Sequence, residues 1–590
     1  MENSGSSRKW GLNAALALVL VIRVLFLNQA IQGDDHIYLT EAMHALVDPA
    51  HPSEVKYVFL GDEVDLRGHS HPPGNAWPLA GLLLLAGDVK EAPFHAAYIL
   101  FSWLAVWAMW RLARRFSERP LWATLLFVAV PTFIVNGGSL EADLPFLAFW
   151  MASIALFVER RWVWAALAMI AATMMAYQGI FLTPILAVYV WLHHRRERAR
   201  WALLLVPVAV FIEWQVFTRL TTGAMPVGKL AGYFATYGFQ ALRNKAASAL
   251  MLFIHSWWIV FPALVPGAAL GAWRRRKEPD TLFLLAWIGL FFAGAVVVFF
   301  SGSARYLLPM AAPVCLLVSR LRVKWLAPGF AVQLAVGLLL AVVNYQHWDG
   351  YRTFAAELRA PTAGHRVWVD NDWGLRYYVE SDHGLAARKG QTVRAGDIIV
   401  SSELGHNVEF TAPLSLVASA VIDPEIPLRL IGLETYSGYS TVEEGYLPFG
   451  MEGGVIDRVT ARMVMERHPA LEYVTIGTAQ AAEQIVSGVF PSDRWMSLAA
   501  VVILKTPATP KRLRAEFYIP PNAKARRVTL LLDGREVASQ AYAAPGPYTL
   551  ETGAAMQGSS VEVRVDQTFT APGDQRQLGM ILMGVGFAQQ

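Results

Sequence analysis

The chain has 590 residues, of which 55% are hydrophobic and 16% charged, and its mean hydropathy is +0.37. This composition excludes an ordinary soluble enzyme and predicts a polytopic membrane protein. The net charge of +4 and the pI near 9.0 arise from Lys and Arg clusters between apolar runs. We therefore attribute the charge to the membrane and predict no nucleic-acid partner. The one cysteine, Cys315, excludes an intramolecular disulfide and lies in an apolar run, where a reactive thiol is not expected.

Eleven apolar runs, several of them short, predict transmembrane helices. The first is longer than a typical signal-peptide core and has no clear cleavage site, so we interpret it as an uncleaved helix. The runs 162–177 and 180–192 are joined by Gln178-Gly179 and predict either a tight helical hairpin or one re-entrant feature. The eleven runs are 10–31, 93–110, 120–136, 144–158, 162–177, 180–192, 201–218, 250–272, 281–300, 306–319 and 325–345.

The loops between these runs differ in charge, which predicts their sidedness. Arg and Lys cluster in alternate connections, whereas the opposite short connections hold only Arg305. By the positive-inside rule the N-terminus is cytoplasmic, and an odd number of helices places 346–590 on the outer side. The outer face then also holds the loops 32–92 and 219–249, and all the candidate chemistry.

An acidic pair, Asp34-Asp35, follows the first span directly. Carboxylates at this lipid-headgroup depth can act on a reaction between a membrane lipid and a molecule on the water side. We predict Asp34 as a general base and Asp35 as a metal ligand or a residue that orients the second substrate. The alternative is an ordinary solvated loop start. A divalent metal is the one cofactor that these carboxylates suggest.

Further polar residues in the outer loops are candidates for the site. Ser70-His71-Pro72-Pro73 precedes an apolar segment, Asn75 to Ala86, that is too short to span and predicts a helix lying in the membrane interface. His71 is a candidate phosphate contact; the alternative is a turn residue. Glu141 and Asp143 lie at the outer end of the fourth span, where acidic groups are costly and usually functional or paired. Helix capping is the alternative for Asp143.

Arg305 begins the segment Arg305-Tyr306-Leu307-Leu308-Pro309 on a face nearly free of positive charge. Its guanidinium suits a phosphate through paired hydrogen bonds, and snorkelling to lipid headgroups is the alternative. Weaker candidates, which could equally be interface anchors, are Lys229, Tyr233, Tyr237, Arg243, Lys245, His255, Trp257 and Trp258. Arg23 and Glu213 lie within apolar spans and could pair with each other or with Asp143.

The C-terminal half has the composition of a folded water-soluble region. Residues 346–511 mix strand-like runs at 366–370, 397–401 and 496–504 with helical stretches such as 452–468, which predicts an α/β domain. From residue 512 short strands follow one another, and Asp533-Gly534 after the strand-like 528–532 is a strong hairpin signal. We expect a small β-sandwich over 512–590.

Four of these motifs resemble, in order, those of the integral-membrane glycosyltransferases of the C-type (GT-C) superfold. The resemblance is to the branch of protein O-mannosyltransferases and aminoarabinose transferases, and it covers residues 10 to 345. The matching residues are Asp34-Asp35 with Tyr38, His71-Pro72-Pro73, Asp143 with Pro145, and Arg305 to Pro309. The chain departs from the aminoarabinose transferases at Ile37, where they have a basic residue, and this position bears on the acceptor.

The resemblance implies a membrane glycosyltransferase domain over 1–345 and inverting transfer of a sugar from a polyprenyl-phosphate lipid to an outer acceptor hydroxyl. Asp34 would be the base, and His71 and Arg305 would lie near the donor phosphate, with Tyr306 and Lys229 as further candidates there. Asp143 joins the catalytic candidates, and Tyr38, Glu141 and His255 complete the site. The acceptor could be a glycan, a lipid or a protein.

A transporter or flippase of a lipid-linked or glycan substrate is the alternative function, since many helices and intramembrane charges also suit transport. A membrane-anchored glycan-binding protein without catalysis is a third. Residues 569–579 resemble part of β-sandwich modules that accompany bacterial glycan enzymes, which indicates either acceptor binding or a structural cap. These resemblances imply a bacterial inner membrane, with the C-terminal half in the periplasm.

Overall fold

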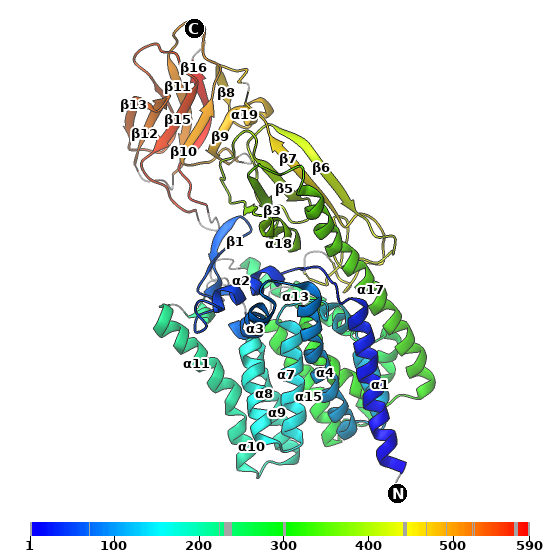
Figure 1. Ribbon diagram of the computed structural model, residues 1–590. Helices are drawn as coiled ribbons and strands as arrows, with labels where there is room; N and C mark the ends of the chain where they lie inside the picture. The colour runs from blue at the N-terminus through cyan, green and yellow to red at the C-terminus, as the bar shows by residue number, and fades with distance from the viewer. Residues whose placement is uncertain are drawn as a thin grey trace.

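The computed structural model describes residues 3–69, 71–223, 225–228, 239–298, 302–440, 445–467, 469–490, 493–521, 523, 525–571 and 576–587. A helical part is formed by the chain up to residue 358, and a sheet-rich part by the remainder (Figure 1). The amino terminus lies at the far end of the helical part, and the carboxyl terminus lies at the opposite end of the molecule (Figure 1). One long helix, α17 (Val323–Leu358), joins the two parts.

The helical part packs around one large apolar core. Its helices are α1 (Asn3–Leu25), α2 (Asp35–Ala45), α3 (Ala76–Ala86), α4 (Glu91–Phe116), α5 (Pro120–Val128), α6 (Pro131–Asn136), α7 (Asp143–Val158), α8 (Trp162–Met175), α9 (Leu182–His193), α10 (Arg198–Leu203), α11 (Leu205–Thr222), α13 (Phe239–Ser256), α14 (Val265–Arg274), α15 (Pro279–Val298), α16 (Ala311–Val318) and α17. Short 3-10 helices lie at Leu66–Gly68, Pro73–Asn75, Tyr177–Phe181, Pro262–Leu264 and Ala304–Met310.

Four of the described helical segments are long and apolar enough to cross a membrane: Glu91–Phe116, Arg198–Thr222, Pro279–Val298 and Val323–Leu358. Shorter apolar helices lie at Trp10–Leu25, Asp143–Val158, Trp162–Met175, Tyr177–His193 and Ala304–Val318. The chain is therefore a multi-pass membrane protein, and the number of eleven spans stays a prediction. The pair at 162–192 forms two separate helices, α8 and α9, with Gln178-Gly179 in the 3-10 turn between them.

Two predicted boundaries in the helical part are wrong. The run 120–136 is broken into α5 and α6 at Pro131, which suits the first turn of a new helix. The last run does not end at 345, because α17 continues to Leu358. Its last three turns bury Trp348, Tyr351 and Phe354 in the core of the following domain. The helix therefore continues because its apolar face changes partner from membrane helices to a sheet.

The sheet-rich part begins with a mixed sheet in the order β4-β3-β5-β7-β6. Its strands are β3 (Val367–Asp370), β4 (Leu385–Ala386), β5 (Ile398–Ser402), β6 (Leu414–Ile422) and β7 (Asp457–Val464), with helix α18 (Gly374–Ser381) between β3 and β4. The helix predicted at 452–468 is wrong, because β7 lies there. Asp457, Val459 and Ala461 are buried at alternate positions, which is the period of a strand rather than of a helix.

The last domain is a β-sandwich whose two sheets have the orders β13-β12-β15-β10-β9 and β14-β11-β16-β8. The strands are β8 (Tyr473–Thr475), β9 (Ile485–Val489), β10 (Met496–Ile503), β11 (Leu513–Ile519), β12 (Arg526–Leu532), β13 (Arg535–Tyr542), β14 (Gly546–Glu551), β15 (Ser560–Val565) and β16 (Ile581–Phe587), and α19 (Ala479–Gln484) lies between β8 and β9. The predicted hairpin at Asp533-Gly534 joins β12 to β13, with positive φ at both residues.

The division predicted at residue 512 does not match these pairings. β10 pairs with β15, and β8 pairs with β16, so strands from 473 onward belong to the sandwich. Their apolar residues share one core with the later strands. The reason is that strand pairing is set between segments far apart in the sequence, which a local change of pattern cannot reveal.

Candidate active site

The acidic pair lies after α1, at the start of helix α2. Gly33 has a φ of +46°, and a Cβ there would lie 2.7 Å from Oε1 of Glu141, so glycine is needed for both conformation and space. Asp34 occupies the N-cap position, but its side chain makes no capping hydrogen bond. Its carboxylate instead lies 3.7 Å from Nη2 of Arg305 and remains 35% exposed. Asp34 is therefore a carboxylate that faces the site rather than one that caps the helix.

Asp35 points the other way and is fully buried. Its Oδ1 accepts hydrogen bonds from the Ser139 hydroxyl at 2.9 Å and the Leu140 amide at 2.7 Å, and its Oδ2 accepts one from the Gln32 amide at 3.1 Å. Burial raises the pKa of Asp35, and these hydrogen bonds oppose the rise. Both oxygens are thus used by the protein, so the predicted role as metal ligand or substrate contact is not supported. Asp35 is a positioning residue that holds the loop before α7 in place through its hydrogen bonds to Ser139 and Leu140.

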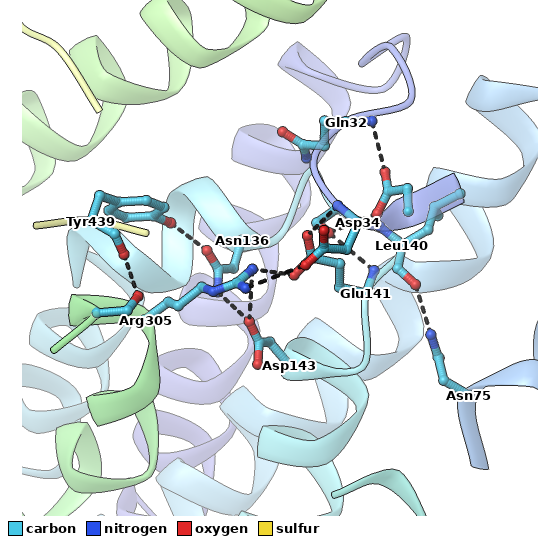
Figure 2. A network of polar contacts seen from close by, with 12 residues as sticks. Gln32, Asp34, Asn75, Asn136, Leu140, Glu141, Asp143, Arg305 and Tyr439 are labelled. Carbon is cyan, nitrogen blue, oxygen red and sulfur yellow. Dashed lines mark hydrogen bonds and ion pairs between the residues drawn. The ribbon is translucent and has the colours of Figure 1, made fainter. Parts of the chain in front are cut away.

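Arg305 lies at the centre of the cluster (Figure 2). It comes from the 3-10 helix Ala304–Met310, and its Nη1 is ion-paired with Glu141 and lies 3.8 Å from Asp143. The alternative of helix capping does not fit Asp143, because its carboxylate faces Arg305 and accepts a hydrogen bond from the Asn136 amide at 3.2 Å. Three carboxylates, those of Asp34, Glu141 and Asp143, therefore surround one guanidinium.

Three carboxylates face one guanidinium in this cluster, so their charges do not balance. This imbalance determines the chemistry that the cluster can support. Glu141 also accepts a hydrogen bond from the Asp34 amide, at 3.2 Å. Burial raises the pKa of Glu141, while the Arg305 guanidinium opposes the rise. Nε of Arg305 is buried and has no hydrogen-bond partner among the described residues. The cluster thus offers partly exposed carboxylate oxygen as a proton acceptor and the Nε–H of Arg305 as a donor.

His71 shares a small cavity with this cluster. The cavity has a volume of about 20 Å³, and its lining includes His71, Asp143, Arg305 and Tyr306. The Tyr306 ring lies 5.6 Å from the Arg305 guanidinium. Nδ1 of His71 lies 3.4 Å from the Met175 carbonyl, and burial lowers the pKa of the imidazole. The structure therefore brings together His71, Arg305 and Tyr306, the described residues predicted near the donor phosphate.

Tyr38 and His255 lie farther from the cluster centre. Tyr38 is buried. Its ring lies edge-on to that of His69, with centroids 5.3 Å apart, and to that of His71, with centroids 6.2 Å apart, so Tyr38 packs against the His71 ring. His255 is buried at the end of α13 against Gly438, where a Cβ would lie 2.6 Å from its Nε2. His255 is therefore a contact between α13 and the sheet-rich part, not a member of the group around Arg305.

Several other predicted residues fall elsewhere. Lys229, Tyr233 and Tyr237 lie outside the described residues. Arg23 does not pair with an acid; it donates to the Ser102 hydroxyl at 2.9 Å and to the carbonyls of Ile134 and Phe133 at 2.7 Å each. Glu213 is exposed on α11. Of the pairings that the sequence left open for Arg23, neither the one with Glu213 nor the one with Asp143 is formed, because the Ser102 hydroxyl and backbone carbonyls of α6 satisfy the guanidinium.

One group of His, Asp and Glu side chains in the described ranges has the spacing of a metal site. Asp48, His51 and Glu54 place one ligand atom each within 4.8 Å of one another, in the loop after α2. His51 already contacts Asp48 at 2.9 Å, and Glu54 contacts Arg67 at 3.2 Å. At the main cluster the guanidinium of Arg305 supplies the positive charge between the carboxylates.

Three residues of the network were not predicted from the sequence. Asn136 bonds to Asp143 and accepts from the hydroxyl of Tyr439, and Gln32 donates to the Gly138 carbonyl. Tyr439 belongs to the sheet-rich part, and its carbonyl accepts a hydrogen bond from the hydroxyl of Ser303, which directly precedes the 3-10 helix Ala304–Met310 that carries Arg305. These side chains are uncharged, so only the position of Gln32 next to the acidic pair was a usable signal.

Comparison with known proteins gives the class. Residues 70–216 match the model of a family described as dolichyl-phosphate-mannose-protein mannosyltransferase. The predicted relationship is confirmed: the chain is a relative of the C-type integral-membrane glycosyltransferases.

Particular relatives lie in the aminoarabinose branch. An undecaprenyl phosphate-alpha-4-amino-4-deoxy-L-arabinose arabinosyl transferase of Pseudomonas savastanoi pv. phaseolicola is 24% identical over 340 residues, which cover 50% of this chain and 61% of that protein. A second, from Pseudomonas fluorescens, is 25% identical over 345 residues with the same coverage. The chain thus matches about three fifths of the length of these relatives. The solved structure of ArnT from Cupriavidus metallidurans bound to undecaprenyl phosphate has a TM-score of 0.45 at 14% identity, covering 66% of this chain and 92% of that chain.

Proposed function

We propose that the protein is an inverting glycosyltransferase that moves a sugar from a polyprenyl-phosphate donor to an acceptor hydroxyl at the outer face of the membrane. The observation that carries the proposal is the convergence of Asp34, Asp143 and Arg305, from three distant segments, at one partly exposed site. Both curated relatives are named as transferases of undecaprenyl-phosphate-linked aminoarabinose, which supports a lipid-phosphate sugar as the donor.

Asp34 is the proposed base. Its side chain is 35% exposed, against 8% for Glu141 and 19% for Asp143, so it is the carboxylate of the cluster most open to an incoming acceptor. It would take the proton of the acceptor hydroxyl while the hydroxyl oxygen bonds to the anomeric carbon. The bond from that carbon to the donor phosphate breaks, and the polyprenyl phosphate leaves with the electron pair. Attack opposite the leaving group inverts the anomeric centre.

Arg305 and His71 are the proposed phosphate contacts. The unused Nε–H of Arg305 can donate to a phosphate oxygen, and His71 shares a cavity with it. A guanidinium placed where negative charge develops on the leaving phosphate stabilises the transition state. The carboxylates around it hold Arg305 in place before the donor arrives.

The proposed orientation follows the charge of the loops. The N-terminus would lie in the cytoplasm, and the cluster and the sheet-rich part would lie on the outer side of a bacterial inner membrane. The transporter alternative needs polar groups near the middle of the bilayer. The cluster lies instead at the ends of α1, α6 and α15, and the intramembrane Arg23 is satisfied by carbonyls.

The direct test is mass spectrometry of lipids that co-purify with the full chain, followed by incubation with membrane extract as a source of acceptor. We expect a bound polyprenyl-phosphate sugar whose sugar is consumed by the wild type and retained by Asp34→Asn. The matched control is Asp88→Asn, an exposed carboxylate in the same outer loop. Consumption of the sugar at the wild-type rate by Asp34→Asn would remove Asp34 as the base, and a chain that binds no such lipid would refute the proposed donor.

A further inference from the structure

Helix α18 of the sheet-rich part packs directly on the segment that carries the acidic pair. Gly374, its first residue, is so close that an added Cβ would lie well inside van der Waals distance of the Ile31 carbonyl oxygen. The close approach brings α18 against the chain just before Asp34. Figure 1 shows α18 between the mixed sheet and the end of the helical part that holds α2.

A hydrogen-bond pair fixes the segment before the acidic pair. The hydroxyl of Tyr378, on α18, accepts a hydrogen bond from the Ile31 amide at 2.8 Å. The same hydroxyl donates to Oε1 of Glu91, at the start of α4, also at 2.8 Å. Ile31 itself is fully buried, so its amide has no access to water as a substitute partner. Loss of the Tyr378 hydroxyl would leave a buried N–H unpaired.

A second set of contacts fixes the residue after the acidic pair. Oε2 of Glu380, the seventh residue of α18, lies 3.3 Å from Nε2 of His36, and the Tyr57 hydroxyl lies 3.2 Å from Nδ1. Burial and the nearby Arg376 lower the pKa of His36 to about 3, so the ring is neutral near pH 7. We assign the ring proton to Nε2, because the Glu380 carboxylate can only accept, and Nδ1 then accepts from Tyr57.

Arg376 makes this second contact rigid. Its Nε donates to Oε1 of Glu380 at 2.8 Å, its guanidinium lies 4.1 Å from the centre of the Tyr57 ring, and it also donates to the Val58 carbonyl. The β1–β2 hairpin of the first outer loop, Lys56–Phe59 with Asp62–Asp65, is thereby fixed to α18 as well. Arg376 is buried, which restricts it to this geometry.

We propose that α18 is a positioning element of the active site, so that the C-terminal half takes part in catalysis and is not only a cap or a glycan-binding module. Tyr378 and Glu380 are the positioning residues: one holds Ile31 and the other holds His36, on either side of Asp34-Asp35. The kinetic part of this inference rests on the proposed transferase function; the structural part does not.

The physical reason is that the acidic pair lies on a short turn between two spans of helix. Gly33, with a φ of +46°, precedes it, and glycine restricts the backbone less than any other residue. A displacement of about 1 Å of a catalytic group can cost about a hundredfold in rate. Contacts on both sides of Asp34 restrict its distance from Arg305 and from the donor sugar.

The first experiment compares Tyr378→Phe with Tyr436→Phe in the full chain. Tyr436 is 78% exposed and serves as the control. For Tyr378→Phe we expect amide hydrogen exchange in residues 26–40 to be at least about tenfold faster, because the Ile31 amide loses its partner. We also expect kcat for sugar transfer to fall about tenfold with the KM for the donor nearly unchanged, and the melting temperature to fall modestly because the buried Ile31 amide is left unpaired. Wild-type exchange in this segment would overturn the proposal.

The second experiment tests both ends of α18. Gly374→Ala should displace Ile31 and lower kcat, whereas Gly453→Ala, at a glycine with open space around it and no positive φ, should have no effect. Glu380→Gln keeps an acceptor for His36 and should retain most of the activity that Glu380→Ala loses. Equal activity of these two Glu380 variants would overturn the role of Glu380. If the wild-type chain transfers no sugar, the exchange measurement still decides whether α18 holds the acidic pair.

Discussion

Two groups of charged side chains lie at opposite ends of the same helices and differ in their balance. At the end of α4, Arg111 pairs with Glu159, and Arg115 pairs with Asp280 at 2.8 Å and 3.0 Å. Each arginine there faces one carboxylate. At the other end, Arg305 alone faces Asp34, Glu141 and Asp143.

The difference separates structural charge from functional charge. A balanced ion pair at the surface contributes a small stabilisation and leaves no carboxylate or guanidinium free to react. An excess of carboxylates repels itself and raises pKa values, so it persists only where the surrounding fold holds it in place. We therefore expect substitutions in the cluster around Arg305 to change activity, and substitutions in the balanced pairs to change only stability.

The largest expected effect is that of Asp34→Asn. Sugar transfer should fall by about a thousandfold or more, because the amide cannot accept the acceptor proton. The melting temperature should stay the same or rise, because one of the mutually repelling carboxylates becomes neutral. The matched change at the balanced end, Asp280→Asn, should lower the melting temperature and leave transfer within about twofold. Both are measured by donor consumption and by thermal unfolding in detergent; the reverse pattern would contradict the distinction.

Arg305→Gln should have the next largest effect. Glu141 is buried and would lose its charged partner, and removing one member of a buried ion pair costs about 3–5 kcal/mol. Binding of the lipid donor, followed by a fluorescent polyprenyl-phosphate analogue, should weaken at least about tenfold, and acceptor binding should weaken less. Arg115→Gln is the control, for which about 1 kcal/mol or less is expected. Unchanged donor binding in Arg305→Gln would place the phosphate elsewhere.

A smaller effect is expected for Asp35→Asn. The amide has one acceptor oxygen where the carboxylate has two, so either the Gln32 amide or the Ser139–Leu140 loop loses its partner. An unpaired buried N–H costs about 1–3 kcal/mol. We expect kcat to fall about tenfold to a hundredfold through displacement of Asp34 and Glu141, together with a lower melting temperature. A loss of metal-dependent activity without a stability change would instead favour a ligand role for Asp35.

The smallest predicted effect is a pH dependence of stability from Glu41, which lies on α2 and accepts a hydrogen bond from Ser53 at 2.7 Å. Burial raises its pKa from 4.5 to about 8. Between these values the unfolded chain releases a proton that the folded chain keeps, so this group lowers stability as the pH rises through that window. In Glu41→Gln the fall in melting temperature between pH 5 and pH 8.5 should be smaller than in the wild type. Glu54→Gln, at an exposed site, is the control.

The sequence predicted those parts of the site that charge and position reveal. Asp34, Asp143 and Arg305 were found because a charged residue at the end of an apolar run is costly unless it has a role. Asn136 and Tyr439 were missed, because neutral polar side chains carry no such signal and the contact between them links residues that are far apart in the chain. The role of Asp35 could not be separated from that of Asp34 before the directions of the two side chains were known.

The fold shows the same difference: a feature set by local sequence was predicted correctly, and pairing between distant segments was not. The hairpin at Asp533-Gly534 was predicted correctly because turn chemistry is local. The strand β7 was mistaken for a helix because a short run with mixed polarity fits both periods. The sandwich boundary was misplaced because β10 finds its partner, β15, some sixty residues later. Neither error affected the site, which depends on the helical part, on α18 and on Tyr439.

Helix α17 has a mechanical consequence. It has 36 residues and runs without a break from the membrane helices into the core of the mixed sheet. At about 1.5 Å per residue it spans about 54 Å, so the sheet-rich part is joined to the membrane helices by a continuous helix rather than by a flexible linker. Inserting one residue after Asn344 would rotate everything beyond it by about 100° about the helix axis, since each turn takes about 3.6 residues. Such an insertion would swing α18 away from Ile31 and His36 without altering a single residue of the site.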